Sequence, residues 1–271
     1  MGDDNSLTAD ERRQHILNQL IETGTVEVSG LSDALDVSRM TIHRDLDQLE
    51  ERNLLRKVRG GATIEPSLLF ESTYAYRKQR APKEKRAAAK AASTFLTPGQ
   101  AIMIDDSTTA EPLVDFLPET APHTVITNAF HMADQLRGNR EIELICLGGT
   151  YNSNFESFLG LFCEQAIQAL RADVLFMSTS AIEDGVAFHQ NQDAARVKRA
   201  MMKVSETTIL LVDQSKFGRT GLIRLADLDE FDRILIGGEV KRTILEDLQE
   251  GETPVDVFTP EDVIPQHYTD N

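Results

Sequence analysis

Apolar residues recur at helical spacing near the start of the chain, between polar residues that favour helix ends. Thr8, with Glu11 three residues later, forms a capping-box pattern, and an apolar stripe over residues 16–21 follows it. Gly24 then supplies a helix stop, and residues 26–28 alternate apolar and polar positions. This pattern predicts a first helix followed by a short strand.

Two more helices are predicted after this strand, joined by a tight turn. Ser29 is placed to cap a short helix that ends at Leu35, and residues 36–38 form the turn. Ser38 is placed to cap a longer helix that runs to about Arg52, with apolar residues at four- and three-residue spacing on one face. Helix, turn and helix in this order indicate a helix-turn-helix unit.

A short basic hairpin is predicted after the third helix. Asn53 tolerates the left-handed backbone that ends a helix. Residues 54–58 and 62–64 are patterned as two strands joined across Gly60 and Gly61. A helix-turn-helix followed by such a hairpin is typical of a winged helix-turn-helix, whose third helix enters DNA.

The pattern changes after residue 65. Proline and a mixed-charge polar run mark residues 66–82 as a linker, and a strong helix-forming stretch begins at Lys83. Short apolar runs then alternate with amphipathic segments. The predicted strands lie at 101–105, 124–127, 141–149, 173–181, 207–213, 233–238 and 253–259. The predicted helices between them lie at 111–117, 129–137, 162–170 and 193–205.

Strands of this kind separated by helices predict a mostly parallel α/β sheet covered on both faces. The fold class is therefore α/β, with a small N-terminal domain and a larger C-terminal one. The expected boundaries are 1–65 for the winged helix-turn-helix, 66–82 for the linker and 83–271 for the α/β domain.

Composition limits the compartment and the chemistry. The chain has 271 residues, and no stretch approaches the ~20 apolar residues of a membrane span. Its polar, acidic N-terminus lacks the pattern of a signal peptide, so we expect a cytoplasmic protein with no membrane partner. Cys146 and Cys163 lie in apolar surroundings and are expected to be buried free thiols. Neither a metal site nor a cofactor is expected.

The formal net charge of −16 is unusual for a DNA-binding protein, because affinity comes from lysine and arginine that neutralise phosphates. Binding is local, however, and the hairpin carries three basic residues with no acid between them. The acidic remainder fits a soluble surface or a high-salt habitat, which the sequence does not separate. The expected DNA contacts on the third helix and the hairpin are Ser38, Arg39, Thr41, His43, Arg44, Gln48, Arg56, Lys57 and Arg59.

The third helix also carries acidic residues that would repel DNA if they faced it. These residues are Asp45, Asp47, Glu50 and Glu51. We expect them on the far side of the helix, or paired with Arg44 and Arg52.

Residues 36–62 resemble the N-terminal region of DeoR-family transcriptional regulators. That region runs V-S-x-x-T-I-R-R-D-L-x-x-L, then a glycine, then a basic stretch ending in G-G-A. The matching residues are Val37, Ser38, Thr41, Ile42, Arg44, Asp45, Leu46, Leu49, Arg59, Gly60, Gly61 and Ala62. His43 stands where the family usually has arginine, and Asn53 where it usually has glycine. The first departure removes a fixed charge, which predicts a changed operator preference or a binding affinity more sensitive to pH.

Four polar loops follow predicted strands of the larger domain, at 105–110, 127–130, 147–150 and 212–219. Ligands of open parallel sheets bind at the carboxyl edge, where such loops meet. Hydroxyl residues before a helix start can hold an anion, and glycines allow close approach to the backbone. The sequence therefore predicts a site for a small polyhydroxyl phosphate. Its expected ligand-binding residues are Asp105, Ser107, Thr108, Thr109, Thr127, Asn128, Gly148, Gly149, Lys198, Asp213, Ser215 and Lys216.

The resemblance to the DeoR family extends over these loops, from Glu11 to about Gly237 in family order. The family's effector domain carries D-x-G-T-T, V-x-T-N, L-x-G-G, V-K-R-x-M and D-x-S-K-F-G-R. Ser107 replaces the usual glycine of the first motif, and its β-carbon is expected to narrow the pocket or strain the loop and so to change ligand identity or affinity. The resemblance implies a sensor domain similar to ribose-5-phosphate isomerase and coenzyme A transferases that binds phosphorylated sugars.

The favoured interpretation is a repressor of sugar-catabolic genes that a phosphorylated sugar releases from double-stranded operator DNA. Operators usually hold two half-sites, so a homo-oligomer, a dimer or tetramer, is expected. One alternative is a sugar-phosphate isomerase or transferase fused to a DNA-binding domain, with Asp105, Asp106, Asp213 and Lys216 as acid–base groups. Another is an architectural or RNA-binding protein, which leaves the four loops without a role. Repression is the common sign of regulation in the family, and activation is the alternative.

Overall fold

The computed structural model describes residues 7–51, 54–63, 73–219 and 221–263. The chain divides into two units, Met1–Arg80 and Ala81–Asn271, and each is described by itself. Among the described helices, none is long and apolar enough to cross a membrane.

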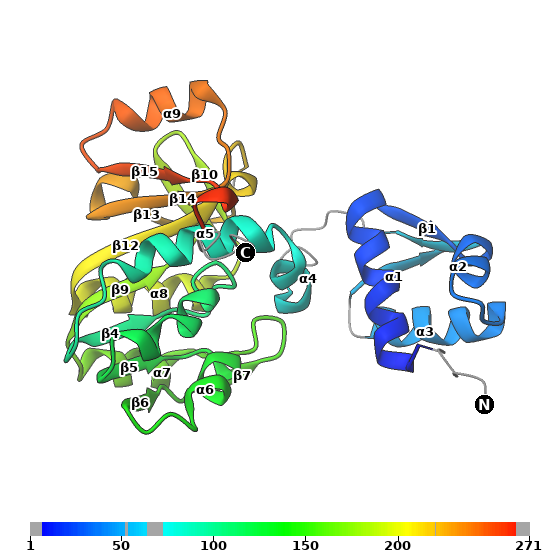
Figure 1. Ribbon diagram of the computed structural model, residues 1–271, viewed down its shortest axis with the longest axis horizontal. Helices are drawn as coiled ribbons and strands as arrows, with labels where there is room; N and C mark the ends of the chain where they lie inside the picture. Colours follow the sequence, from blue (N-terminus) through cyan, green and yellow to red (C-terminus); the bar gives the residue numbers. More distant parts are fainter. Residues whose placement is uncertain (1–6, 52–53, 64–72, 220, 264–271) are drawn as a thin grey trace, which may run out of the picture. The chain divides into compact units, whose positions relative to one another are not determined.

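The N-terminal unit contains four helices and a three-stranded antiparallel sheet among its described residues (Figure 1). In chain order its elements are α1 (Ala9–Thr23), β1 (Thr25–Glu27), α2 (Val28–Ala34), α3 (Arg39–Glu51), β2 (Arg56–Val58), β3 (Gly61–Thr63) and α4 (Tyr74–Gln79). The sheet has the order β1-β3-β2, so the hairpin formed by β2 and β3 is anchored to the helices through β1. This arrangement confirms the predicted winged helix-turn-helix.

The helix ends follow the predicted caps with one exception. Thr8 and Glu11 form the capping box of α1, and the Thr41 backbone N–H donates to Ser38 Oγ at 3.1 Å at the start of α3. The prediction that Ser29 caps α2 is wrong. The helix begins one residue earlier, at Val28, and Glu27 occupies the cap position without a side-chain hydrogen bond to the helix backbone. The predicted helix end at Arg52 and Asn53 lies outside the described residues.

One hydrophobic core holds the N-terminal unit together. Its fully buried members come from all three helices of the motif and include Ile16, Leu20, Leu31, Ile42, Leu46 and Leu49. Tyr76 of α4 also packs in this core. The described part of the predicted linker therefore contains a helix that contributes to the winged helix-turn-helix.

The C-terminal unit is built on a seven-stranded parallel sheet, as predicted. Its strands are β4 (Ala101–Ile104), β5 (His123–Thr127), β6 (Ile142–Cys146), β9 (Ala172–Met177), β12 (Ser205–Asp213), β14 (Arg233–Gly237) and β15 (Val255–Phe258). Their order across the sheet is β15-β14-β12-β9-β4-β5-β6. The chain moves from β4 to β5 on one side and later to β9 on the other. The strand order therefore reverses between β4 and β9, where ligands of open α/β sheets bind.

Helices cover both faces of this sheet (Figure 1). One face packs against α5 (Pro82–Ser93), α6 (Phe130–Leu136) and the 3-10 helices η1 (Glu111–Asp115) and η2 (Leu117–Glu119). The other face packs against α7 (Leu161–Gln168) and α8 (Gln192–Val204). Further elements are α9 (Arg242–Gln249), η3 (Gln214–Lys216), η4 (Leu228–Glu230) and η5 (Pro260–Val263).

The structure differs from the predicted elements in three respects. The helix expected at 111–117 is instead two 3-10 turns, and Pro118 in the second lacks the backbone N–H that a continuous α-helix through this segment would need. The hairpin of β7 (Thr150–Asn152) and β8 (Ser157–Leu159) was not predicted. Neither was the antiparallel sheet of β10 (Ala181–Glu183), β11 (Val186–His189) and β13 (Ile223–Asp227), nor helix α9.

The two cysteines are both free, but their environments differ. Cys163 is buried at the start of α7, and burial raises the pKa of its thiol to about 12. Cys146 is exposed at the end of β6, so the expectation of two buried thiols is wrong for this residue. The cause is that β6 is an edge strand of the sheet.

Candidate functional sites

Helix α3 presents a polar face to solvent, opposite the core. Ile42, Leu46 and Leu49 are fully buried, which fixes the rotation of the helix about its axis. The residues predicted to read DNA lie on the remaining surface, with Thr41 half-buried and the others exposed: Ser38, Arg39, His43, Arg44 and Gln48. Met40 is also exposed on this helix and was not predicted to contact DNA. The structure therefore leaves these side chains accessible to a partner of this unit.

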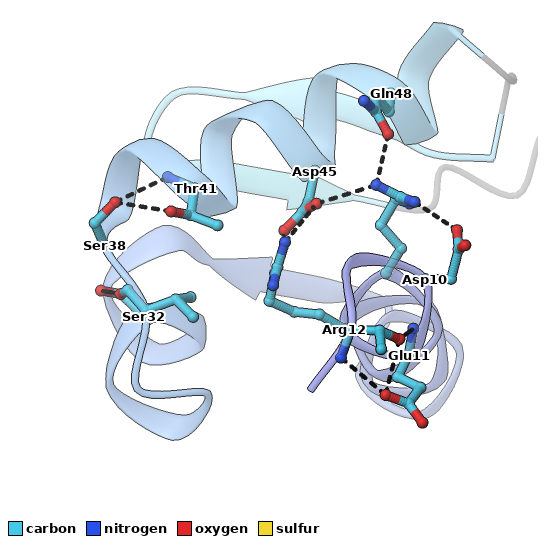
Figure 2. Close-up of polar contacts among 11 residues, drawn as sticks. Asp10, Glu11, Arg12, Ser32, Ser38, Thr41, Asp45 and Gln48 are labelled. Carbon is cyan, nitrogen blue, oxygen red and sulfur yellow. Dashed lines mark hydrogen bonds and ion pairs between the residues drawn. The ribbon is translucent and has the colours of Figure 1, made fainter. Parts of the chain in front are cut away.

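A buried ion-pair network joins α1 to the inner side of α3 (Figure 2). Arg12 donates through Nε to Asp45 Oδ2 at 2.5 Å and through Nη2 to Oδ1 at 3.2 Å. Arg13 Nη1 lies 3.4 Å from Asp45 Oδ1 and donates to Gln48 Oε1 at 2.6 Å. Hydrogen bonding to Asp45 raises the pKa of Arg12, so this guanidinium stays charged. Asp45 lies on the far side, as predicted, but its partners are Arg12 and Arg13.

The hairpin carries the remaining predicted DNA contacts. Arg56 and Arg59 are exposed, whereas Lys57 is half-buried. The Lys57 ammonium pairs with Asp47 of α3, and the Lys57 backbone N–H donates to Glu50 Oε1 at 2.7 Å. The hairpin is thus attached to the second half of α3.

A buried cluster of three charged side chains lies at the strand-order reversal of the C-terminal unit. Asp105 and Asp106 follow β4 and Lys198 comes from α8, and each is at most 2% exposed. The Lys198 ammonium pairs with Asp105 Oδ2 and lies 3.0 Å from Asp106 Oδ1. Burial opposes the charged amine, yet the two carboxylates outweigh burial and raise the pKa of Lys198. The predicted ligand residues Asp105 and Lys198 are therefore in direct contact.

Backbone and hydroxyl donors fix the two carboxylates of this cluster. Asp105 accepts from the backbone N–H groups of Ser107 and Ser178, each at 2.9 Å. Asp106 Oδ2 accepts from Ser157 Oγ at 3.0 Å. These bonds connect the ends of β4 and β9 with the hairpin strand β8.

A second lysine reaches the loop after β4. Lys85 of α5 is 3% exposed and donates from Nζ to Thr108 Oγ1 at 3.0 Å. Sequence reasoning missed Lys85, Asp106 as a partner of Lys198, and the serines of β8 and β9. A signal for Lys85 was present, because it lies three and seven residues before Ala88 and Ala92, on the buried stripe of its helix.

Within the part of the chain that the structure describes, three side-chain atoms at the carboxyl edge of the sheet are buried without a hydrogen-bond partner. They are Asn128 Oδ1 after β5, Ser178 Oγ after β9 and Asp213 Oδ2 at the end of β12. Each residue is at most 2% exposed. Their other polar groups are used: Asn128 Nδ2 donates to the Phe158 carbonyl at 3.1 Å, and Asp213 Oδ1 accepts from the Ser215 N–H at 2.8 Å. Buried polar atoms are usually paired, so the unpaired ones are candidate ligand contacts.

The remaining predicted residues divide between buried and accessible positions. Thr109 and Thr127 are buried, whereas Ser215 and Lys216 on η3 are half-buried. Gly148 and Gly149 are exposed, and a β-carbon on Gly149 would lie 2.6 Å from the Leu159 carbonyl oxygen. The chain's own packing therefore accounts for glycine at position 149. No group of three or more potential metal-ligating residues capable of holding a metal ion occurs within the described ranges.

Two domain families match this chain in the same order as the two units. The DeoR-like helix-turn-helix domain matches residues 12–67, and the DeoR C terminal sensor domain matches residues 80–238. The second match alone covers more than half of the chain.

Related proteins align over most of the chain. The HTH-type transcriptional regulator GlpR of Haloferax volcanii is 30% identical over 91% of this chain and 97% of its own length. The glycerol-3-phosphate regulon repressor of Haemophilus influenzae is 32% identical over 89% and 94%. The L-fucose operon activator of the same species is 33% identical over 82% and 90%.

Solved structures resemble the chain more distantly. Ribose 5-phosphate isomerase A from Methanocaldococcus jannaschii aligns with 50% of this chain and 54% of its own, at 17% identity and a TM-score of 0.36. Translation initiation factor eIF-2B from Pyrococcus horikoshii aligns with 83% and 86%, at 14% identity and a TM-score of 0.42. The expected likeness to ribose-5-phosphate isomerase is thus found, at a level that carries no argument about activity.

The three relatives are transcription regulators, which confirms the interpretation as a regulator over that as an enzyme. This interpretation agrees with the helix-turn-helix and its accessible α3, with the buried cluster of the parallel sheet and with both domain matches. The chain belongs to the DeoR family of transcriptional regulators, with a DNA-binding helix-turn-helix unit and a DeoR C terminal sensor domain.

Proposed function

We propose that this regulator represses a sugar-catabolic operon in the cytoplasm and that a phosphorylated sugar releases it from its operator. The observation that carries the sensor half is the buried polar edge of the sheet. Charged, hydroxyl and amide groups gather there, and three of their atoms have no hydrogen-bond partner among the described residues. The names of the Haemophilus influenzae relatives, which concern glycerol 3-phosphate and L-fucose, support a carbohydrate-related effector.

The chemistry of the unpaired atoms favours a ligand that donates several hydrogen bonds. Asn128 Oδ1 and Asp213 Oδ2 can only accept, so they suit hydroxyl groups and disfavour phosphate oxygens. The phosphate then belongs nearer the 107–109 loop and the half-buried Lys216, which carry hydroxyl groups and a cation. A sugar phosphate satisfies both requirements, whereas inorganic phosphate satisfies only the second.

Release would follow from linkage between the two ligands. An effector that binds more tightly to the arrangement with low DNA affinity shifts the population away from the operator. Two paired reading helices are needed for two half-sites, so a homodimer or homotetramer is part of the proposal.

The test combines a thermal-shift screen with a DNA-release assay. Phosphorylated pentoses, hexoses and trioses are screened first, because a ligand of the folded state raises the melting temperature. Each stabilising compound is then added to the protein bound to a duplex that it selected from a random pool. We expect at least one sugar phosphate to stabilise and release, and inorganic phosphate to do neither.

A pair of variants localises the effect. Asp213→Asn should abolish the thermal shift by the active compound, whereas Asp229→Asn, at an exposed position of η4, should leave it unchanged. Failure of every sugar phosphate to shift the melting temperature would refute the sensor half. Stabilisation without release would refute the proposed linkage.

A further inference from the structure

The hairpin strand β2 places its residues on two different faces. In the register of β2 with β3, Lys57 lies opposite Ala62, which is fully buried, while Arg56 lies opposite Thr63. Directly opposed residues of an antiparallel pair share a face, and successive residues alternate between faces. Lys57 therefore lies on the core-facing side of the hairpin, and Arg56 and Val58 lie on the other side.

Two carboxylates of α3 converge on Lys57. Asp47 and Glu50 are three residues apart, so they lie on one face of the helix. The Asp47 carboxylate pairs with the ammonium group of Lys57, and Glu50 Oε1 accepts a hydrogen bond from the Lys57 backbone N–H at 2.7 Å. A single hairpin residue is thus held at both its side chain and its main chain.

We propose that Lys57 is a positioning residue. Together with Asp47 and Glu50 it forms a clamp that holds the hairpin against α3, the helix predicted to read DNA. The inference rests on the DNA-binding half of the proposed function. It assigns Lys57 a different role from the phosphate contact expected from the sequence, and leaves phosphate binding to the exposed arginines Arg56 and Arg59.

The clamp also explains how the exposed carboxylate of Asp47 is tolerated on α3. The Asp47 side chain is 53% exposed, and an unpaired carboxylate there would repel DNA phosphates. Its pairing with Lys57 cancels that charge locally and fixes the hairpin at the same time. Removal of the Lys57 ammonium would therefore weaken operator binding although Lys57 itself binds no phosphate.

Salt dependence distinguishes the two roles of Lys57. On duplex DNA, the slope of log affinity against log salt changes by about 0.9 for each phosphate that a variant no longer neutralises. Binding of the full chain is measured across a range of KCl concentrations, on a selected duplex and on a random-sequence 30-base-pair duplex. The variants are Lys57→Met and, as the matched control, Arg59→Met.

We expect Lys57→Met to change the slope by much less than Arg59→Met does and to bind the selected duplex roughly two- to fivefold more weakly, the range of an exposed ion pair. Arg59→Met should flatten the slope by about 0.9 per protomer. A slope that flattens for Lys57→Met as it does for Arg59→Met would overturn the proposal. So would a Lys57→Met variant with unchanged affinity and slope. Absence of salt-dependent binding by the wild-type chain would instead refute DNA binding itself.

A second comparison tests the clamp as a unit. Asp47→Asn should weaken binding of the selected duplex relative to Glu51→Gln, which removes the same charge at an exposed neighbouring position. The double variant Asp47→Asn, Lys57→Met should bind no more weakly than Lys57→Met alone, because partners of one interaction are not additive. If the two substitutions weakened binding independently, so that their fold-changes multiplied in the double variant, the clamp would be contradicted.

Amide exchange tests the contact of Glu50 with the hairpin backbone. The exchange rate over residues 54–63 should rise in Glu50→Ala and stay near wild type in Glu50→Gln, which keeps the acceptor oxygen. Equal exchange rates in both variants would also contradict the clamp.

Discussion

Replacing Lys198 by methionine tests the buried cluster of the sensor unit. The substitution roughly preserves the length of the side chain but removes the cation that Asp105 and Asp106 share. Both carboxylates are at most 3% exposed, so neither can be hydrated in place of its missing partner. Removing one partner of a buried ion pair typically costs about 3–5 kcal/mol.

The structure sets an upper limit to this cost. Asp105 keeps two backbone N–H donors and Asp106 keeps the Ser157 hydroxyl, so one carboxyl group can take up a proton while the other stays charged. The pKa of an aspartate in the unfolded chain is about 3.9, which is about 3 units below pH 7. Protonating it at pH 7 therefore costs about 1.4 kcal/mol for each of these units. The loss in free energy of unfolding should therefore not exceed about 4 kcal/mol at pH 7.

The same reasoning predicts a pH signature. A carboxyl group whose folded pKa is raised above its unfolded value loses stability as pH rises, so the deficit of Lys198→Met should shrink to about 2 kcal/mol at pH 5.5. The assay is urea unfolding followed by amide exchange in β4 and β9, which reports on the sensor unit alone. Asp106→Asn added to Lys198→Met should recover most of the loss, because a single carboxylate then remains. A deficit below about 1 kcal/mol, or one independent of pH, would refute the reasoning.

Three further substitutions test other parts of the chain. Arg44→Ala should cost about 1–3 kcal/mol of operator binding in fluorescence anisotropy and leave effector-induced thermal shifts intact; loss of both would contradict separate roles for the two units. Gly237→Ala should destabilise the sensor unit by more than ~2 kcal/mol in calorimetry, because its β-carbon would lie 1.8 Å from the Glu84 carbonyl oxygen; Gly138→Ala, with no atom nearby, should be neutral. Burial lowers the pKa of His123, so the sensor unit should lose stability as pH falls below ~6.5, and His123→Gln should reduce that loss in melting curves between pH 7.5 and 5.5.

Local patterns predicted the regular elements well, because caps and periodicity act between neighbours in the chain. Thr8 with Glu11 and Ser38 start their helices as predicted, and all seven strands of the parallel sheet were found from their apolar runs. The predictions failed where a second local effect opposed the pattern on which the prediction relied. The segment 111–117 forms 3-10 turns and meets Pro118, which has no backbone N–H to continue an α-helix, and Ser29 was not needed as a cap once α2 began at Val28.

Residue types and strand ends placed the predicted ligand residues at the carboxyl edge of the sheet, but they did not predict which side chains contact one another. The four loops were predicted to meet because parallel strands end at one edge, and the parallel pairing of the strands gives them that common edge. Lys198 was expected near this edge; its burial between Asp105 and Asp106 depends on α8 packing beside β9. The contact of Lys85 with Thr108 was not predicted because the two residues lie 23 positions apart in the sequence.

The sequence by itself determined the family, the order of the two domains, the strands and the polar loops, because each follows from patterns between residues close in the chain. Only the tertiary structure decided which charges are paired. Asp45 is held by Arg12 and Arg13, 33 and 32 residues away, and Lys57 of the hairpin is held by Asp47 of α3. The energy of a charge depends on its burial and on its partners in space, neither of which sequence spacing specifies. Lys57 was therefore predicted as a DNA contact from its type, whereas its position in the fold points to a clamp.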